Sequence, residues 1–408
     1  MQEGAGGSHR LREITGARFV AAAIVFWTHV FWVRSMPKPF ELLASHGRAA
    51  VCFFFILSGF ILAYTYRNRI RKGWVSEFIF ARFARIYPMH IAALCFSIPV
   101  ALYSIRHNQN FASWVNAATL TPANAIESWL ASAALFQIYI PHPHFGFLWN
   151  SPCWSIACEA TFYVSFPFFF NFILRTLKTW KTTLAAIFSC FVVQFLLIFI
   201  SVYWVRHYSN GDERHVMEEI VYKLPFFRIW EFWMGCCIGL LFIDFRPRFL
   251  QVRLWRDFGL TIGFLLVALI VAATYLHVYG TFYGHWFVLY TLPFSVIILC
   301  LASGPTYLSK SLGSPLAVLL GDASYSFYLL HFLFILLLGC FYHNRNTPFV
   351  VIIETFIVCS CTSIICFKYI ETPARLWIKT LGRSRKDEPQ RELNDSVSES
   401  KRSQSQFG

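Results

Sequence analysis

Long apolar runs recur along the whole chain and leave little scope for a water-soluble fold. Of the 408 residues, 57% are hydrophobic and only 14% are charged. A helix needs about 20 apolar residues to cross the hydrocarbon core, and only helices or closed barrels satisfy their backbone there. We therefore predict an all-α, polytopic transmembrane helical bundle of about ten spans, near residues 17–33, 49–66, 86–104, 154–174, 182–204, 224–244, 258–278, 286–303, 319–342 and 348–369.

The charges between these runs predict the orientation of the bundle. The formal net charge is +14, but the cations are spread over short loops, so the pattern does not favour a nucleic acid partner. Residues 67–72, 175–181 and 246–256 are rich in Lys and Arg, whereas residues 279–285 contain neither. Because basic loops stay in the cytoplasm, both termini are expected there.

The segment 105–153 is the longest interruption between spans. Its apolar stretch, residues 129–140, is too short for a comfortable crossing, so we expect a re-entrant or interfacial segment on the outer face. A true span there would invert everything downstream. The expected organisation is a cytoplasmic segment (1–16), a transmembrane domain (17–375) and a disordered, polar cytoplasmic tail (376–408).

The first apolar run carries two ionisable side chains, Arg18 and His29. They are eleven residues apart, which returns to the same helix face with a rise of roughly 16 Å. Ionisable groups inside a span are costly and default to a functional interpretation. In the predicted orientation, Arg18 lies at the cytoplasmic boundary and His29 lies in the outer half of the membrane.

A second basic feature begins the third span, where Arg82 and Arg85 are three residues apart in FARFARIYP. This spacing puts both on one helical face. With Arg18 they can form one cytoplasmic anion site, because guanidinium groups suit phosphate. The alternative is that the pair only anchors the helix in the membrane surface.

Glu159 is an acid within the otherwise apolar fourth span, near its outer end. We expect it at about the depth of His29, where a carboxylate would orient the imidazole. The alternatives are a pair with another cation or a place on a polar cavity. Secondary candidates are Arg228, Glu231, Asp322 and His331.

Each secondary candidate also has a structural interpretation. Arg228 and Glu231 are three residues apart and can pair on the helix surface. A lone buried histidine such as His331 is more often structural than catalytic. Glu371 lies where the last span leaves the membrane and is expected to pair with a nearby cation. The twelve cysteines include no CxxC pair, so we expect space-filling thiols and no metal site.

Several segments, taken in order, resemble the acyltransferase-3 family of integral-membrane acyltransferases. They are ITGARFVAAAIVFWTH, GRAAVCFFFILSGFILAY, FARFARIYP, WSIACEATFYVSFP, RIWEFWMG, GDASYSFYLLH and YIETPAR. The resemblance covers about residues 12–375. The chain departs from the family pattern at two positions. Thr15 stands where the family often has an Asp, and Ala50 stands where the family's second segment has its second Gly.

This resemblance implies an O-acyltransferase that moves an acyl group, usually acetyl, from cytoplasmic acyl-CoA to a hydroxyl of a carbohydrate or glycoconjugate such as exopolysaccharide or lipopolysaccharide. It implies His29 as base or acyl relay, Glu159 as an essential acid, and Arg18, Arg82 and Arg85 as donor-binding residues. Acyl-CoA is then a co-substrate and no cofactor is bound. The expected location, among membrane lipids, is the bacterial inner (plasma) membrane.

Two other classes of protein fit part of the sequence. A transporter or flippase of a sugar-bearing or acylated lipid also has many spans and intramembrane charges. The chain lacks the internal repeat that many transporters show. A structural or sensor membrane protein would leave the spacing of the charged residues unexplained.

Overall fold

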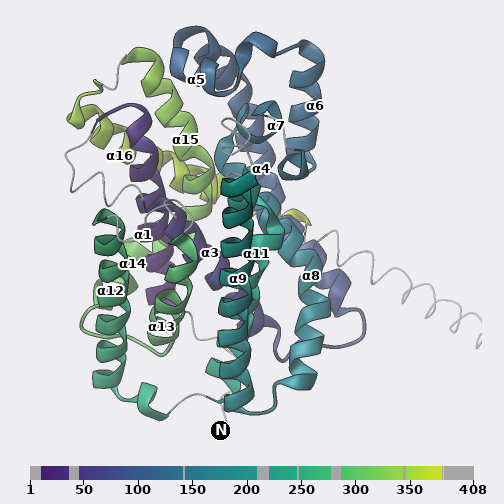
Figure 1. Cartoon of the computed structure of the whole chain (residues 1–408), viewed down its shortest axis with the longest axis vertical. Helices are drawn as coiled ribbons and strands as arrows, with labels where there is room; N and C mark the ends of the chain where they lie inside the picture. Colours follow the sequence, from purple (N-terminus) through teal and green to yellow (C-terminus); the bar gives the residue numbers. More distant parts are fainter. Residues whose placement is uncertain are drawn as a thin grey trace, which may run out of the picture.

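The helices of this protein lie mostly along its long axis (Figure 1). The computed structural model describes residues 11–35, 46–140, 143–208, 220–245, 248–276, 286–342, 346–378 and 380. The regular structure of these residues is helical, apart from one isolated bridge between Arg34 and Asn346. The expected amino-terminal segment up to residue 10 and most of the expected tail lie outside the described residues.

The main helices follow the predicted apolar runs. In chain order they are α1 (Arg12–His29), α3 (Gly47–Tyr66), α4 (Trp74–His107), α8 (Trp154–Thr176), α9 (Trp180–Tyr208), α11 (Pro225–Asp244), α12 (Arg253–Tyr275), α13 (Thr291–Ala302), α14 (Pro315–Asp322), α15 (Ser324–Phe341) and α16 (Phe349–Cys366).

Within the described part of the chain, eight helical segments are long and apolar enough to cross a membrane by length and composition. They correspond to eight of the ten predicted spans. The other two predicted spans correspond to α1 and to the shorter apolar helix Phe287–Ala302. The all-helical, polytopic prediction is therefore confirmed, whereas the count of ten and the orientation stay predictions.

Two predicted spans differ markedly from the observed helices. The third span was expected from residue 86, but α4 begins at Trp74 and runs for 34 residues. Such a helix rises about 50 Å, which exceeds the roughly 30 Å hydrocarbon core. The predicted span 319–342 is divided at Ala323 between α14 and α15. Hydropathy does not detect this division because both helices are apolar.

The segment before α8 forms short helices at one end of the molecule, here called the α5–α7 end (Figure 1). These are α5 (Gln109–Trp114), α6 (Pro122–Ala133) and α7 (Pro143–Phe147). The 12 residues of α6 rise only about 18 Å, so this helix does not cross a bilayer. The segment instead covers the ends of α4 and α15 with a small apolar cluster that includes Phe111, Trp149 and Phe332.

The helices divide into interior and peripheral sets. In the apolar 18-residue stretches of α3, α11 and α15, 72%, 72% and 78% of the residues are buried. The corresponding shares are 11% in α12 and 17% in the segment that contains α16. Peripheral helices that expose apolar side chains are suited to contact lipid. The interior helices are therefore where buried polar groups are expected to be functional or paired.

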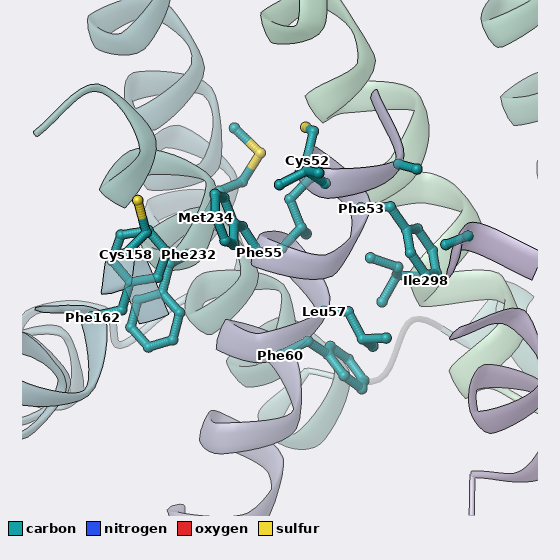
Figure 2. Packing of buried hydrophobic residues seen from close by; sticks show 14 of the residues in the cluster. Cys52, Phe53, Phe55, Leu57, Phe60, Cys158, Phe162, Phe232, Met234 and Ile298 are labelled. Atoms are coloured by element: carbon teal, nitrogen blue, oxygen red, sulfur yellow. The ribbon is translucent and has the colours of Figure 1, made fainter. Parts of the chain in front are cut away.

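The interior is packed through close helix contact and aromatic rings (Figure 2). The backbones of α3 and α11 approach closely at Gly59 and Gly235, where an added Cβ would overlap the facing carbonyl oxygen. Phe162 of α8 packs against Phe55 and Phe232, with ring centroids 5.0 and 5.1 Å apart. Small residues at such crossings are typical of membrane helix packing.

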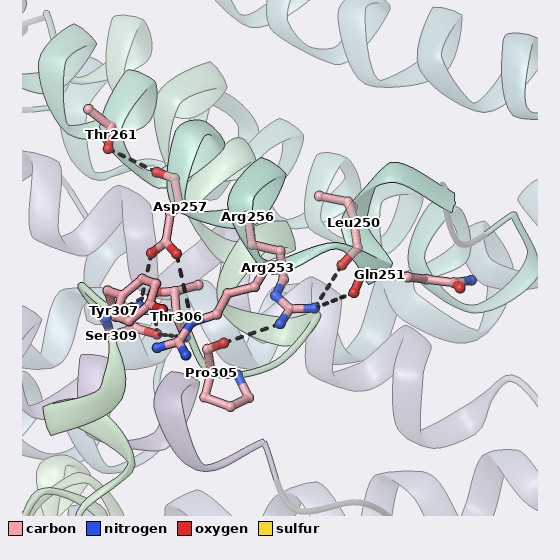
Figure 3. Close-up of polar contacts among 10 residues, drawn as sticks. All are labelled: Leu250, Gln251, Arg253, Arg256, Asp257, Thr261, Pro305, Thr306, Tyr307 and Ser309. Carbon is pink, nitrogen blue, oxygen red and sulfur yellow. Dashed lines mark hydrogen bonds and ion pairs between the residues drawn. The ribbon is translucent and has the colours of Figure 1, made fainter.

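Basic residues at the start of α12 are used to fix a loop (Figure 3). Arg256 donates to the carbonyl oxygens of Leu250 at 3.0 Å and Pro305 at 3.2 Å. Asp257 accepts from the backbone N–H of Tyr307 at 2.9 Å. This cluster therefore stabilises the connection between α13 and α14, at the end of the molecule opposite α5–α7.

Candidate active site

A cavity of about 380 Å³ lies among α1, α3, α4, α8 and α15. The predicted site residues that line it are Arg18, Arg82, Arg85 and Glu159, together with the side chains of Tyr163, Tyr325 and Tyr328. The structure thus brings the three arginines to one place, as the sequence predicted. His29 is not among the residues that line this cavity.

Local packing explains how α1 presents Arg18 to the cavity. The opposite side of α1 carries Gly16, whose missing side chain leaves room for the backbone at Leu312. Ala21 and Ala22 are also buried. Small side chains on both sides of α1 let neighbouring elements approach closely. Arg18 is thereby held within the bundle.

Arg85 is paired with a carboxylate from the far end of the chain. Its guanidinium forms an ion pair with Glu371, a buried residue that ends the π-helix η10 (Phe367–Glu371). Ser326 of α15 donates a hydrogen bond to Glu371 at 3.0 Å. Single-turn π-helices are rare and occur frequently at functional sites. The cation expected near Glu371 is therefore Arg85, and α4, α15 and the chain after α16 meet at this pair.

Arg82 has no such partner. Its guanidinium lies 5.9 Å from the ring centroid of Tyr66 and 6.0 Å from that of Tyr163. Its Nε is buried and has no hydrogen-bond partner, and none of the ion pairs among the described residues includes Arg82. Buried N–H donors are normally satisfied. Arg82 therefore has donor capacity left for a ligand in the cavity.

Glu159 belongs to the arginine cavity and not to His29, which corrects the expected placement. Tyr163, one turn later on α8, donates to its Oε2 at 2.9 Å. Arg85, Arg18 and Arg82 all lie within electrostatic range of this carboxylate. The expected place beside His29 was wrong, because depth was judged from the start of α8, and the alternative of a place on a polar cavity agrees with the structure. That start follows the turn Ser151–Cys153, which is itself buried, so the first turns of α8 already face the cavity.

Asp322 is a second acid near the arginines. It ends α14 and lies within electrostatic range of Arg18, as does Glu159. The cavity is therefore lined by the Glu159 carboxylate as well as by three arginines, with Asp322 near Arg18, and is not a purely basic surface. Arg85 is paired with Glu371, whereas Arg82 Nε is buried without a hydrogen-bond partner among the described residues.

His29 meets another histidine. Nε2 of His331 lies 3.2 Å from Nδ1 of His29, and the two ring centroids are 5.0 Å apart. On its other side, His29 packs edge to face against Phe332, with centroids 5.2 Å apart. His331 is fully buried. The partner of the predicted base is thus an imidazole and not the carboxylate that the sequence suggested.

Helix α15 connects the histidine pair to the cavity. Tyr325 and Tyr328 line the cavity, and His331 is one turn further along the same helix. These three residues are spaced by three, which keeps them near one helix face. Tyr325 donates to the carbonyl oxygen of Ile86 in α4 at 2.7 Å. The spacing was visible in the sequence, but nothing in it showed that this face of α15 contacts α1 at His29.

Comparison with known proteins decides the family. The family model described as an acyltransferase domain, of the acyltransferase-3 type, matches residues 11–369. The chain belongs to the acyltransferase-3 family. The match includes every helix that lines the cavity and both histidines. The protein is therefore an integral membrane acyltransferase.

Several curated relatives of this acyltransferase carry related names. Over 340 residues the chain is 27% identical to acyltransferase MdmB of Streptomyces mycarofaciens, covering 80% of this chain and 79% of that protein. It is 25% identical over 229 residues to O-acetyltransferase OatA of Staphylococcus aureus, covering 54% of this chain and 35% of that protein. The chain thus spans about a third of the length of OatA. No solved structure was found to match.

The remaining secondary candidates form a buried network apart from the cavity of this acyltransferase. Arg228 Nη2 lies 3.0 Å from Glu231 Oε2, and both side chains are fully buried instead of lying on the helix surface. Gln194 of α9 donates to Glu231 Oε1 at 2.8 Å. The Arg228 guanidinium also lies 4.0 Å from the ring centroid of Phe287. These contacts tie α11 to α9, which favours a structural role.

The described residues of this acyltransferase include His, Cys, Asp and Glu side chains, the usual protein ligands of metal ions. They contain no group of three or more His, Cys, Asp or Glu side chains arranged to hold a metal ion. The polar side chains at the site are imidazole, guanidinium, carboxylate and phenol groups.

Proposed function

We propose that this acyltransferase moves an acyl group, acetyl in the first instance, from cytoplasmic acyl-CoA to a hydroxyl of a carbohydrate acceptor. The observation that carries the proposal is that the arginine cavity and the histidine pair lie along the same two helices, α1 and α15. One region offers binding for anions, and the other offers a base. The name of the relative OatA, an O-acetyltransferase, supports acetyl as the group transferred.

The donor is proposed to bind with its phosphates at the arginine cavity. Arg82 has unused donor capacity there, and Arg18 is the neighbouring cation on α1. Guanidinium groups bind phosphate oxygens with charge-assisted hydrogen bonds. The 380 Å³ of the cavity is of the size of small-ligand sites. The rise from Arg18 to His29, roughly 16 Å, is of the order of the extended pantetheine arm.

The acceptor is proposed to approach His29 from the α5–α7 end. Phe332 packs against His29, and its ring centroid lies 6.2 Å from that of Trp114 of α5. The ring centroid of Trp114 in turn lies 4.4 Å from that of Phe147 of α7. Phe332 is itself buried, whereas the partly exposed ring of Trp114 is suited to the apolar face of a sugar ring. Trp149 and Trp154 are buried, so they pack the interior instead of forming an exposed sugar platform.

The proposed step is a direct transfer. His29 Nε2 takes the proton of the acceptor hydroxyl while the hydroxyl oxygen bonds to the thioester carbonyl carbon. The carbon–sulfur bond then breaks, and the leaving CoA thiolate takes the proton from His29 Nε2. The products are the O-acyl ester and the CoA thiol, with His29 returned to its neutral form. General base catalysis by histidine contributes typically 10²–10⁴-fold to a rate. Glu159 holds the arginine cluster in place.

The decisive experiment compares His29→Ala with the wild-type enzyme in membranes that contain equal amounts of folded protein. With acetyl-CoA labelled in the acetyl group, transfer to carbohydrate should fall about 10³-fold. His107→Ala is the matched control, because His107 is exposed and makes the same contact to the carbonyl four residues earlier.

Three results would contradict parts of the proposal. Full transfer by His29→Ala would remove His29 from the chemistry. Movement of a lipid without label on any acceptor would indicate a transporter or flippase. Label retained on the protein when the acceptor is omitted, and lost in His29→Ala, would replace direct transfer by an acyl-histidine relay.

A further inference from the structure

The two histidines that meet between α1 and α15 each have a second contact, to a backbone carbonyl. His29 Nδ1 lies 2.9 Å from the carbonyl oxygen of Val25, and His331 Nδ1 lies 2.7 Å from that of Tyr328. The two rings contact each other through His331 Nε2 and His29 Nδ1, which are 3.2 Å apart. One backbone acceptor is thus fixed to each ring.

These carbonyl contacts assign the protons. A carbonyl oxygen only accepts hydrogen bonds, so the Nδ1 atom of each neutral ring carries the proton. The lone pair of His331 is then on Nε2, which faces His29. The Nδ1–H of His29 is shared between the Val25 oxygen and His331 Nε2, and the lone pair of His29 is left on Nε2.

We propose that His331 is a positioning residue for His29, in the place that a carboxylate takes in a Ser-His-Asp triad. This inference rests on the proposed function of His29 as the base. His331 fixes the tautomer that leaves His29 Nε2 free, and its lone pair stabilises the Nδ1–H when Nε2 takes the acceptor's proton. No bond to His331 forms or breaks, and the Nδ1 proton stays on His29.

The surroundings of His331 hold its ring in this orientation. The ring is fully buried and stacks on Phe327, with centroids 6.2 Å apart and planes 10° from parallel. Phe327 in turn packs against Phe26 of α1 at 6.0 Å. A flip of the His331 ring would remove the Nδ1–H donation to Tyr328. A hydrogen-bonded orientation partner of a base must be held in this way.

A neutral partner is also compatible with the local charge. A carboxylate at this buried position would need its own cation to offset desolvation. The acids of the site, Glu159 and Asp322, instead lie near Arg18. Lys223 is a cation within electrostatic range of His29, and an imidazole accepts the hydrogen bond from His29 without adding a further charge to this end of the site.

The kinetic test compares two substitutions at the same position. His331→Phe keeps the ring volume and removes the acceptor, whereas His331→Gln keeps an oxygen that can accept. Since hydrogen bonds to charged groups are the stronger class, His331→Phe should lower kcat about 10- to 100-fold and leave the donor KM within about two-fold. His331→Gln should recover at least part of the loss, and the exposed-site control His107→Phe should match the wild type.

Equal losses in His331→Phe and His331→Gln, or no loss in either, would overturn the positioning role. A failure of the proposed function gives a different result, because His29→Ala would then retain transfer whatever happens at His331.

A spectroscopic test uses the unmodified full chain and does not depend on the folding of a variant. In protein labelled with ¹⁵N-histidine in lipid nanodiscs, His29 and His331 should both be neutral and protonated on Nδ1. A through-bond or through-space correlation should connect His29 Nδ1–H with His331 Nε2. The signals are assigned by difference with His29→Gln. A His331 ring protonated on Nε2 would overturn the inference.

Discussion

At the scale of single residues, the guanidinium groups of Arg82 and Arg85 differ in their partners. Arg85 is paired with Glu371, whereas Arg82 Nε is buried without a partner among the described residues. We therefore expect Arg82→Ala to raise the KM for acyl-CoA about 10- to 100-fold, since a charged hydrogen bond to phosphate is lost. Arg82→Lys should recover only part, because an ammonium cannot bind bidentately.

Initial rates at varied donor and acceptor concentrations measure this effect. The KM for the acceptor should change much less than the KM for the donor. Arg71→Ala is the control, because Arg71 is exposed and pairs with Glu77 outside the cavity. Equal rises of both KM values would argue against a phosphate-binding role for Arg82.

Glu371 is expected to matter for stability as well as for the cavity. Its carboxylate is buried against Arg85, so Glu371→Gln leaves a largely buried guanidinium without its counter-charge. Removing one partner of a buried pair costs about 3–5 kcal/mol in soluble proteins. The melting temperature of the purified protein in detergent should fall clearly.

The matched comparison is Asp244→Asn, which breaks the partly exposed Arg67–Asp244 pair at 3.0 Å. Exposed pairs contribute about 0–1 kcal/mol, so this variant should melt near the wild type. Similar melting shifts in Glu371→Gln and Asp244→Asn would show that burial does not govern the strength of these pairs.

The sequence anticipated some of these residues and misplaced others. Helix periodicity predicted that Arg82 and Arg85 lie on one face of their helix. The predicted orientation of the spans suggested that they share a site with Arg18. The position of Glu159 did not follow, because depth was counted from a helix start that is buried. The contact of His331 with His29 depends on how α1 packs on α15, which no local pattern encodes.

At the scale of helices, the α3–α11 contact is the feature most sensitive to volume. Gly59 and Gly235 each face the backbone of the other helix with no room for a Cβ. Overpacking a well-packed interior costs about 1–3 kcal/mol, and backbone cannot move aside as a flexible side chain does. Gly59→Ala should therefore reduce both the yield of folded protein and its melting temperature.

Gly146→Ala is the matched control for that substitution, because nothing lies within 4 Å of where its Cβ would be. Thermal unfolding followed by size-exclusion chromatography distinguishes the two variants. Unchanged melting of Gly59→Ala would mean that α3 and α11 separate at little cost.

The existence of these helices was readable from apolar runs, but their ends were less so. The early start of α4 at Trp74 adds polar turns, including Arg82, that hydropathy counts against a span. The division at Ala323 lies within a continuous apolar stretch. Hydropathy measures affinity for lipid and interior alike, so it does not detect a helix break inside either environment.

At the scale of the whole molecule, the proposed chemistry depends on which end faces the cytoplasm. Acyl-CoA must reach the arginine cavity, and the α5–α7 end must face the acceptor (Figure 1). We predict that cysteines introduced one at a time at Arg69 and Glu127 are accessible from opposite sides of the membrane. Arg69 lies in the connection between α3 and α4, and Glu127 lies on α6; both are exposed. An impermeant maleimide should label Glu127→Cys in intact bacterial cells and Arg69→Cys only after permeabilisation.

The wild-type chain is the control for this labelling, because Cys95 and Cys361 are exposed on α4 and α16. Both lie within apolar helices, where a membrane shields thiols from a polar reagent. If Arg69→Cys were labelled in intact cells and Glu127→Cys were protected, the bundle would have the orientation opposite to the predicted one. The arginine cavity would then open away from the cytoplasmic pool of acyl-CoA, and the proposed route of the donor from Arg82 toward His29 would be excluded together with the orientation.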